Sequence, residues 1–248
     1  MKHVFLFVLF LNACAVSAQE IVTVDDGTAS QKNIVKLNLA ALAVKNVSIQ
    51  YERQVANDIT VAATFRFMPQ ANVPFKSTII KLADDEDVKR QLNNLQIANV
   101  AVIPEVRFYL GKRGAFHGFY LAPFAGITKY DADLLFEYDD NNQTKTVPMT
   151  GSVNSITGGI LIGAQWKLSK VLYLDWWILG PNYGRSYGDI DGSVALTASE
   201  QQSLRDALDK LDIPLTKITY TVNNSGAAIN FKGPWAGIRS GLCFGFRF

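Results

Sequence analysis

The sequence predicts an all-β protein, an eight-stranded antiparallel transmembrane β-barrel with short helices in long external loops. Eight segments between residues 33 and 248 alternate apolar and polar side chains with a period of two, the side-chain period of a β-strand. The seven connections run short, short, long, short, long, short, long, and outer-membrane barrels have short periplasmic turns and longer outer loops. Past residue 18 no apolar run approaches the ~20 residues of a membrane helix. A membrane crossing would therefore use strands.

The N-terminus predicts export. A basic start at Lys2 precedes an apolar run from Val4 to Leu11 and a small-x-small site ending at Ala18. We expect a signal peptide cleaved after Ala18. Alternatively, Leu11-Asn12-Ala13-Cys14 resembles a lipoprotein box that would make Cys14 the lipidated residue, although Asn12 fits it poorly. The expected division is a signal peptide at 1–18, a loose lead at 19–32 and the barrel at 33–248.

The charge balance and the cysteine content argue against a nucleic-acid partner and against an internal disulfide. The chain has 24 basic and 22 acidic residues, and loss of Lys2 with the signal leaves 23 against 22. This balance gives no basis for nucleic acid as a partner. Cys243 would be the one cysteine left after cleavage at Ala18, so no internal disulfide is expected.

The expected strands follow from the alternation in order. In the second, Val47, Ile49 and Tyr51 oppose polar neighbours at 48, 50 and 52. In the fourth, Pro104 is awkward for a central strand because proline cannot donate to the ladder. The eight segments span residues 33–44, 47–55, 59–68, 99–110, 116–130, 153–167, 171–183 and 235–248.

Two long connections carry helix signals. Asp84 can cap a helix that places Val88, Leu92 and Leu95 on one face. The run from Thr197 to Glu200 is a capping box. It is followed by leucines at helical spacing, at positions 204, 208 and 211.

The last strand carries an assembly signal. Its apolar face ends in Phe244, Phe246 and Phe248, while glycine and arginine alternate on the other face. A terminal phenylalanine resembles the C-terminal signature of outer-membrane proteins. We therefore expect location in the cell outer membrane, with outer-membrane lipid and the barrel assembly machinery as partners.

Charged residues on the polar faces predict a filled lumen. They could form an ion path or proton relay, or ion pairs that fill the interior. Eight strands leave room only for side chains, so we favour a structural charge network, centred on Glu52, Glu105, Arg107 and Arg239. The full set is Lys36, Glu52, Arg66, Glu105, Arg107, Asp175, Arg239 and Arg247.

Aromatic residues at strand ends predict an interfacial girdle, because such rings suit the headgroup boundary. In a soluble protein the same residues would be packed in a core. The girdle set is Trp166, Tyr173, Trp176, Trp177 and Trp235.

No catalytic, cofactor or metal site is expected, and the sequence does not predict an enzyme. Gly184–Gly188 matches G-x-S-x-G, but it opens a predicted loop, and His117 lies beside a turn at the other end. Two acidic runs lack the ligand spacing of a calcium loop and are read as a helix cap and a turn. These runs are Asp84–Asp87 and Asp189–Gly192.

Three segments carry a family resemblance: Asn46–Arg53, Pro104–Leu110 and Trp176–Pro181. They resemble the DUF3575 family of Bacteroidetes. The resemblance implies a small OmpA/OmpW-like outer-membrane barrel with a porin-like fold, and it supplies no catalytic residues.

The expected function is a structural or interaction role: envelope integrity, adhesion or a subunit of a surface complex, with a protein partner bound through the long loops. One alternative is an OmpW-like conduit for small apolar solutes. A third is a soluble periplasmic barrel that binds a ligand inside, which would need its apolar face turned inward.

Overall fold

The computed structural model describes residues 31–82, 86–209 and 215–248. The expected signal peptide, the cleavage site at Ala18, Cys14 and most of the N-terminal lead lie outside these ranges, as do Asp84, Asp85 and Leu211.

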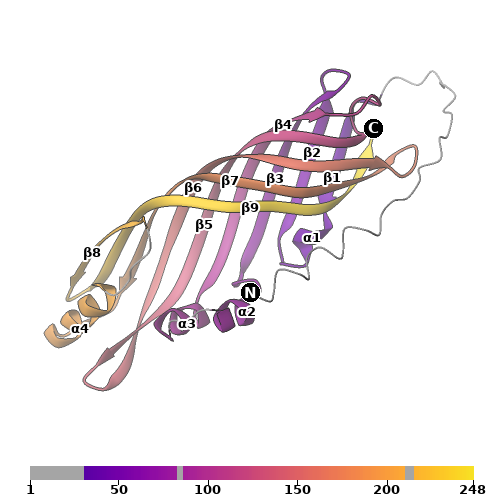
Figure 1. The fold of residues 1–248 in the computed structure, drawn as a ribbon. Helices are drawn as coiled ribbons and strands as arrows, with labels where there is room; N and C mark the ends of the chain where they lie inside the picture. The colour runs from indigo at the N-terminus through magenta and orange to yellow at the C-terminus, as the bar shows by residue number, and fades with distance from the viewer. Residues whose placement is uncertain (1–30, 83–85, 210–214) are drawn as a thin grey trace, which may run out of the picture. The chain divides into compact units, whose positions relative to one another are not determined.

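Eight strands close into a ring (Figure 1). Each pairs antiparallel with the next, and the last also pairs with the first, so that Val35 lies opposite Phe246. Closure removes the unpaired edges that an open sheet would present. The predicted eight-stranded antiparallel ring is confirmed. Its members are β1 (Asn33–Asn38), β2 (Val47–Gln54), β3 (Ile59–Asn72), β4 (Gln96–Tyr109), β5 (Gly118–Asp140), β6 (Gln143–Lys167), β7 (Leu172–Ser193) and β9 (Gly226–Arg247).

The helices and one further strand lie in the connections at the end of the ring opposite the C-terminus (Figure 1). They are α1 (Leu39–Leu42), α2 (Lys76–Leu82), α3 (Glu86–Asn93), α4 (Ala198–Asp209) and β8 (Lys217–Asn223), which pairs with the start of β9. The predicted capping box forms: the Glu200 amide donates to Thr197 Oγ1 at 3.3 Å, and the Thr197 amide donates to Glu200 Oε2 at 2.7 Å. Within the described ranges, no helix is long and apolar enough to cross a membrane.

Several predicted strand limits are wrong. Residues 131–150, expected as a loop, continue β5 and β6 as a ribbon, which turns at Asn141 and Asn142 with φ of 49° and 61°. Two positive φ angles are the signature of a tight hairpin turn. Likewise β7 continues to Ser193, and β9 begins at Gly226 rather than at 235. The first strand ends early because the side chain of Asn38 caps α1, accepting from the Ala41 amide at 3.2 Å.

Pro104 is accommodated in β4 with its side chain on the outer surface. It pairs with Ala63 of β3, while the ladder to β5 runs from Val102–Ile127 to Glu105–Phe124 without recorded pairs between. The missing N–H of proline explains a break at this position.

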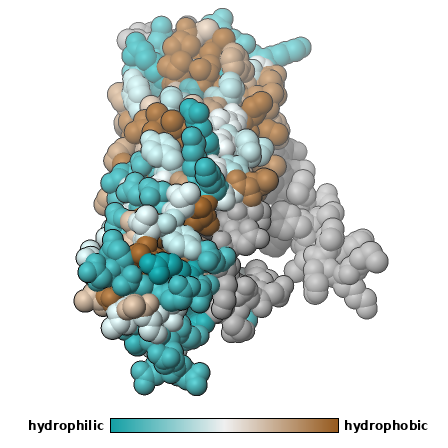
Figure 2. Space-filling view, turned by 90° about the vertical axis from the view of Figure 1, so that its left-hand side faces the viewer, coloured by the Kyte–Doolittle hydropathy of each residue, from teal (hydrophilic) through white to brown (hydrophobic). Residues whose placement is uncertain are grey.

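The ring is inverted relative to a soluble sheet. In β2 the inward Ser48, Gln50 and Glu52 are buried, whereas the outward Val47, Ile49 and Tyr51 are about two-fifths exposed. The alternation of buried inward and exposed outward side chains also holds in β3, β4 and β5, where inward residues such as Ile103, Tyr120 and Phe124 form an apolar cluster inside the ring. Figure 2 shows hydrophobic side chains gathered towards the upper part of the molecule and hydrophilic ones at its lower end.

A second apolar cluster lies beyond the ring. We call this region, formed by the described residues in 131–150 and 188–232, the outer extension. Here α4 packs Leu204 and Leu208 against the ribbon and the start of β9, with Phe136, Met149 and Ile229 buried in the same cluster. The extension therefore has a conventional hydrophobic core of its own.

Candidate functional site in the barrel interior

Six charged side chains meet inside the ring, and we call them the central network. Arg107 of β4 joins three carboxylates: its Nε donates to Glu105 Oε1 at 2.5 Å, and its Nη1 donates to Asp175 Oδ2 at 2.7 Å and to Glu52 Oε2 at 3.1 Å. Lys36 Nζ donates to the same Asp175 oxygen at 2.5 Å and contacts Glu52. Arg239 of β9 pairs with the other oxygen of Glu105.

The central network is balanced in charge. Three cations (Lys36, Arg107 and Arg239) face three carboxylates (Glu52, Glu105 and Asp175), and their side chains are 0 to 8% exposed. Unpaired charges at this burial would carry a large desolvation cost. The pairing satisfies them across five strands, β1, β2, β4, β7 and β9.

Neutral polar groups complete the hydrogen bonding. Tyr109 donates to Glu52 at 2.8 Å, Tyr120 donates to Asp175 at 2.7 Å, and Trp177 Nε1 donates to Asp175 at 3.0 Å. Gln50 donates to Glu105, and Gln165 accepts from Lys36. Sequence reasoning did not identify these neutral partners, although Gln50 and Tyr109 hold inward positions two residues from a network charge.

Aromatic rings close the interior on the side of the short turns. Phe116 and Tyr173 are fully buried there. Arg247 lies over the Phe116 ring at 4.8 Å from its centre and donates to the Tyr173 hydroxyl at 2.7 Å. Arg247 thus belongs to this closure rather than to the central network.

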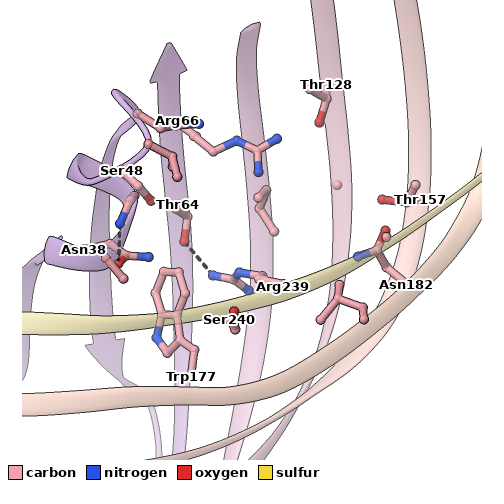
Figure 3. Close-up of a pocket in the computed structure, with 18 of the residues that line it drawn as sticks. Asn38, Ser48, Thr64, Arg66, Thr128, Thr157, Trp177, Asn182, Arg239 and Ser240 are labelled. Atoms are coloured by element: carbon pink, nitrogen blue, oxygen red, sulfur yellow. Dashed lines mark hydrogen bonds between the residues drawn. The ribbon is translucent and has the colours of Figure 1, made fainter. Parts of the chain in front are cut away.

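A cavity of about 450 Å³ lies on the opposite, loop-facing side of the network. We call it the loop-side cavity. Arg239 lines it, donating to Thr64 at 3.0 Å and lying 4.1 Å from the Trp177 ring centre. Arg66 of β3 also lines it and extends across it in Figure 3. Of the eight predicted lumen charges, Arg66 and Arg239 line this cavity, and of these two only Arg239 also belongs to the central network.

The predicted aromatic girdle separates into three groups. Trp166 and Trp176 are exposed on the outer face, and Trp235 is half-buried and lines the loop-side cavity. Tyr173 and Trp177 are buried inside the ring, so the girdle assignment is wrong for these two. Strand alternation gives the reason, because both share the inward parity of Asp175. The terminal residues Phe244, Phe246 and Phe248 are exposed on the outside.

The G-x-S-x-G run does not form a catalytic pair. It lies within β7 rather than in a loop, and Ser186 pairs with Ser155 of β6, whereas Gly118, next to His117, pairs with Gln165. Ten positions along β6 separate the two sites by about 33 Å. Asp189 and Asp191 also lie in β7 rather than in a turn. In the ranges that the structure describes, no three His, Cys, Asp or Glu side chains are grouped to hold a metal ion.

Comparison with known proteins gives one family match. The model of a family described as "Protein of unknown function (DUF3575)" matches residues 4–187. No curated protein matches the chain. Two solved structures are similar: CarO of Acinetobacter baumannii (11% identity, 88% of this chain and 97% of that chain, TM-score 0.38) and the translocator domain of the autotransporter NalP from Neisseria meningitidis (10%, 90% and 90%, TM-score 0.36).

Proposed function

Since this chain belongs to the DUF3575 family, a family of unknown function, we propose from its own geometry that it is a small outer-membrane β-barrel with a structural or interaction role. The observation that carries the proposal is the inverted ring, with apolar side chains outside and an interior closed at the level of the charge-balanced central network. Cleavage of a signal peptide after Ala18 is part of this proposal.

The outer face supports a lipid surrounding. Soluble monomers rarely expose contiguous apolar patches above a few hundred Å². Here every ring strand presents large apolar residues outward, for example Phe65, Val102, Ile160 and Phe244. A soluble periplasmic barrel would need the opposite arrangement, with its apolar face inward, so the observed faces count against that alternative.

The interior supports a scaffold rather than a conduit. At the level of the central network, Lys36, Glu52, Arg107 and Asp175 are fully buried. An eight-stranded ring has no room for a pore beside such side chains. A path for small apolar solutes would have to break these ion pairs.

The outer extension is the part that we propose contacts a partner. Its own core, which includes Leu204 and Leu208, holds the ribbon and α4 together independently of the interior of the ring. The proposed roles are envelope integrity, adhesion or membership of a surface complex. The exposed Phe248 end would be presented to the assembly machinery during insertion.

The experiment is the gel mobility of the detergent-extracted outer-membrane fraction, boiled and unboiled, followed by conductance of the purified protein in planar bilayers. We expect a boiling-dependent shift and no discrete conductance steps. Release by alkaline carbonate without detergent, together with no shift, would overturn the membrane assignment. Regular conductance steps would instead favour the conduit.

A further inference from the structure

Among the cations inside the ring, Arg66 is in an unusual environment. Its Nε is buried and has no hydrogen-bond partner, and across the described residues no ion pair of its side chain is recorded. Lys36, Arg107 and Arg239 each contact a carboxylate. The guanidinium of Arg66 extends across the loop-side cavity (Figure 3). A cation placed there is available to an anion that enters from the loop side.

The lining of the cavity carries no carboxylate to neutralise Arg66. Its two charged residues are Arg66 and Arg239, and Arg239 is already paired with Glu105. The cavity therefore has an unbalanced positive charge. A guanidinium offers two parallel N–H donors in the geometry of a carboxylate, so one bound carboxylate would both satisfy the donors and balance the charge.

The remaining lining is mixed, and its polar part suits hydroxyl groups. Asn46 is more than nine-tenths buried, and its Oδ1 accepts no hydrogen bond, so that it offers an acceptor to a ligand hydroxyl. Short polar side chains from four different strands surround the cavity: Ser48, Thr128, Thr157 and Asn182. Such groups can form hydrogen bonds with the hydroxyls of a ligand.

The volume of the cavity and its aromatic surface narrow the class of ligand further. A volume of about 450 Å³ lies within the range of small-molecule sites. Trp235 and Tyr130, whose ring centres are 5.2 Å apart, add flat apolar surface to the lining. Aromatic faces of this kind pack against the C–H face of a pyranose ring. We propose that the loop-side cavity binds a small sugar acid, with its carboxylate on Arg66 and its hydroxyls on the polar lining.

The test is titration calorimetry on the purified full-length barrel in detergent, with D-glucuronate and D-galacturonate as probes. We expect saturable binding of at least one of them and no detectable heat with D-glucose, which keeps the ring but lacks the carboxylate. Arg66→Gln should weaken the acid at least tenfold, and Arg66→Lys should weaken it less because the charge remains. Arg185→Gln, which removes an arginine exposed outside the ring, should leave the affinity unchanged.

Several results would overturn the proposal. The proposed site would be wrong if neither acid bound the unaltered protein. It would also be wrong if the Arg66→Gln variant bound the acid as tightly as the unaltered protein. Equal binding of D-glucose would refute the anionic class, and equal binding of inorganic sulfate would reduce the cavity to a general anion site. The boiled and unboiled gel check confirms that each variant is folded. The titration does not depend on the barrel's role in the membrane, so either proposal can fail alone.

Discussion

Arg107 is the residue on which the interior depends most, because its guanidinium contacts carboxylates from three strands: Glu52, Glu105 and Asp175. No two of these strands are joined by a short connection that would fix the pairing locally. The network therefore acts as a register check, since a one-residue slip of any strand would turn its charge outward into the apolar face.

Removing one network carboxylate should destabilise the barrel strongly. We expect Glu105→Gln to lower the free energy of unfolding by about 3–5 kcal/mol, because Arg107 and Arg239 would lose a buried partner. Urea unfolding of the refolded protein measures this change in the free energy of unfolding. The control is Asp131→Asn, which breaks an exposed pair with Lys129 (both side chains 55% exposed) and should cost less than about 1 kcal/mol. An unchanged unfolding midpoint for Glu105→Gln would contradict the network.

Sequence reasoning expected Glu52, Glu105, Arg107 and Arg239 to form the centre of the network, and the structure pairs them, but Lys36 and Asp175 were not expected at that centre. The period of two assigns Glu52, Glu105 and Asp175 to the inner face, since strand geometry alone decides parity. The contact of Lys36 with Asp175 spans 139 positions and depends on ring closure and register, which alternation leaves open. The separate environment of Arg66 depends on its height along β3, which is again a matter of register.

Among the elements, β6 shows how an inward-facing glycine leaves space for a neighbouring side chain inside the ring. Gly163 lies on its inner face, and a Cβ there would be 2.3 Å from the hydroxyl of Tyr120, which donates to Asp175. At Gly158, five positions earlier, the nearest atom to such a Cβ is 3.9 Å away. The glycines of this strand are therefore not equivalent.

The contrast predicts that the same substitution destabilises the barrel at one glycine and has little effect at the other. Gly163→Ala should lower the free energy of unfolding by about 1–3 kcal/mol, because the added methyl forces Tyr120 to move. Gly158→Ala should change it by less than about 0.5 kcal/mol, as is usual for surface substitutions. Urea unfolding of both variants makes the comparison. Equal effects would show that Tyr120 does not occupy the space above Gly163.

The attachment of α4 to the ribbon should be sensitive to acid. The hydrogen bond from Lys145 Nζ at 2.7 Å, with those from Thr197, lowers the pKa of Glu200 from 4.5 to about 2. Lys145 also lowers the pKa of Asp140. A carboxylate with a depressed pKa in the folded state stabilises it above its unfolded pKa, and this stabilisation is lost as the pH falls through the folded pKa. All these groups lie in the outer extension.

We therefore expect hydrogen-exchange protection of the α4 amides, corrected for intrinsic rates, to fall between about pH 4.5 and pH 2. Glu200→Gln should lower the protection at pH 6 and reduce the size of the fall. Amides of β6 within the ring serve as the internal control and should not change. Protection of α4 that is constant over this interval would contradict the attachment.

For the helices and strands, the sequence predicted which elements exist better than it predicted where they end. The capping box at Thr197 predicted α4 because its signal is local. The ribbon at 131–150 was missed because its outward-facing residues do not continue the apolar outer surface of the ring. The apolar-outward alternation that marks the ring strands therefore stops there. Its turn at Asn141 and Asn142 is a local signal that could have identified the hairpin.

The molecule as a whole combines two kinds of construction. The ring encloses its charged groups, together with buried aromatic and aliphatic side chains, and presents apolar residues outward. The outer extension instead buries an apolar cluster around Leu204 and Leu208. The predicted closed ring is confirmed, and the turns on one side are short. The prediction of a long fifth connection is wrong: this connection is the two-residue turn at Asn141 and Asn142. The loop-side cavity could not be predicted, because it is bounded by side chains from most of the ring at once.

The most direct test of the inverted ring uses two neighbouring tryptophans on opposite faces. Trp176 is 45% exposed on the outer surface, and Trp177 is 2% exposed inside the ring. In two variants that each keep one of these and carry phenylalanine at the other tryptophan positions, fluorescence is measured in bilayers of lipids brominated in the acyl chains. We predict strong quenching of Trp176 and little quenching of Trp177. Quenching of both to the same degree, or of neither, would contradict a lipid-facing exterior around a sealed interior.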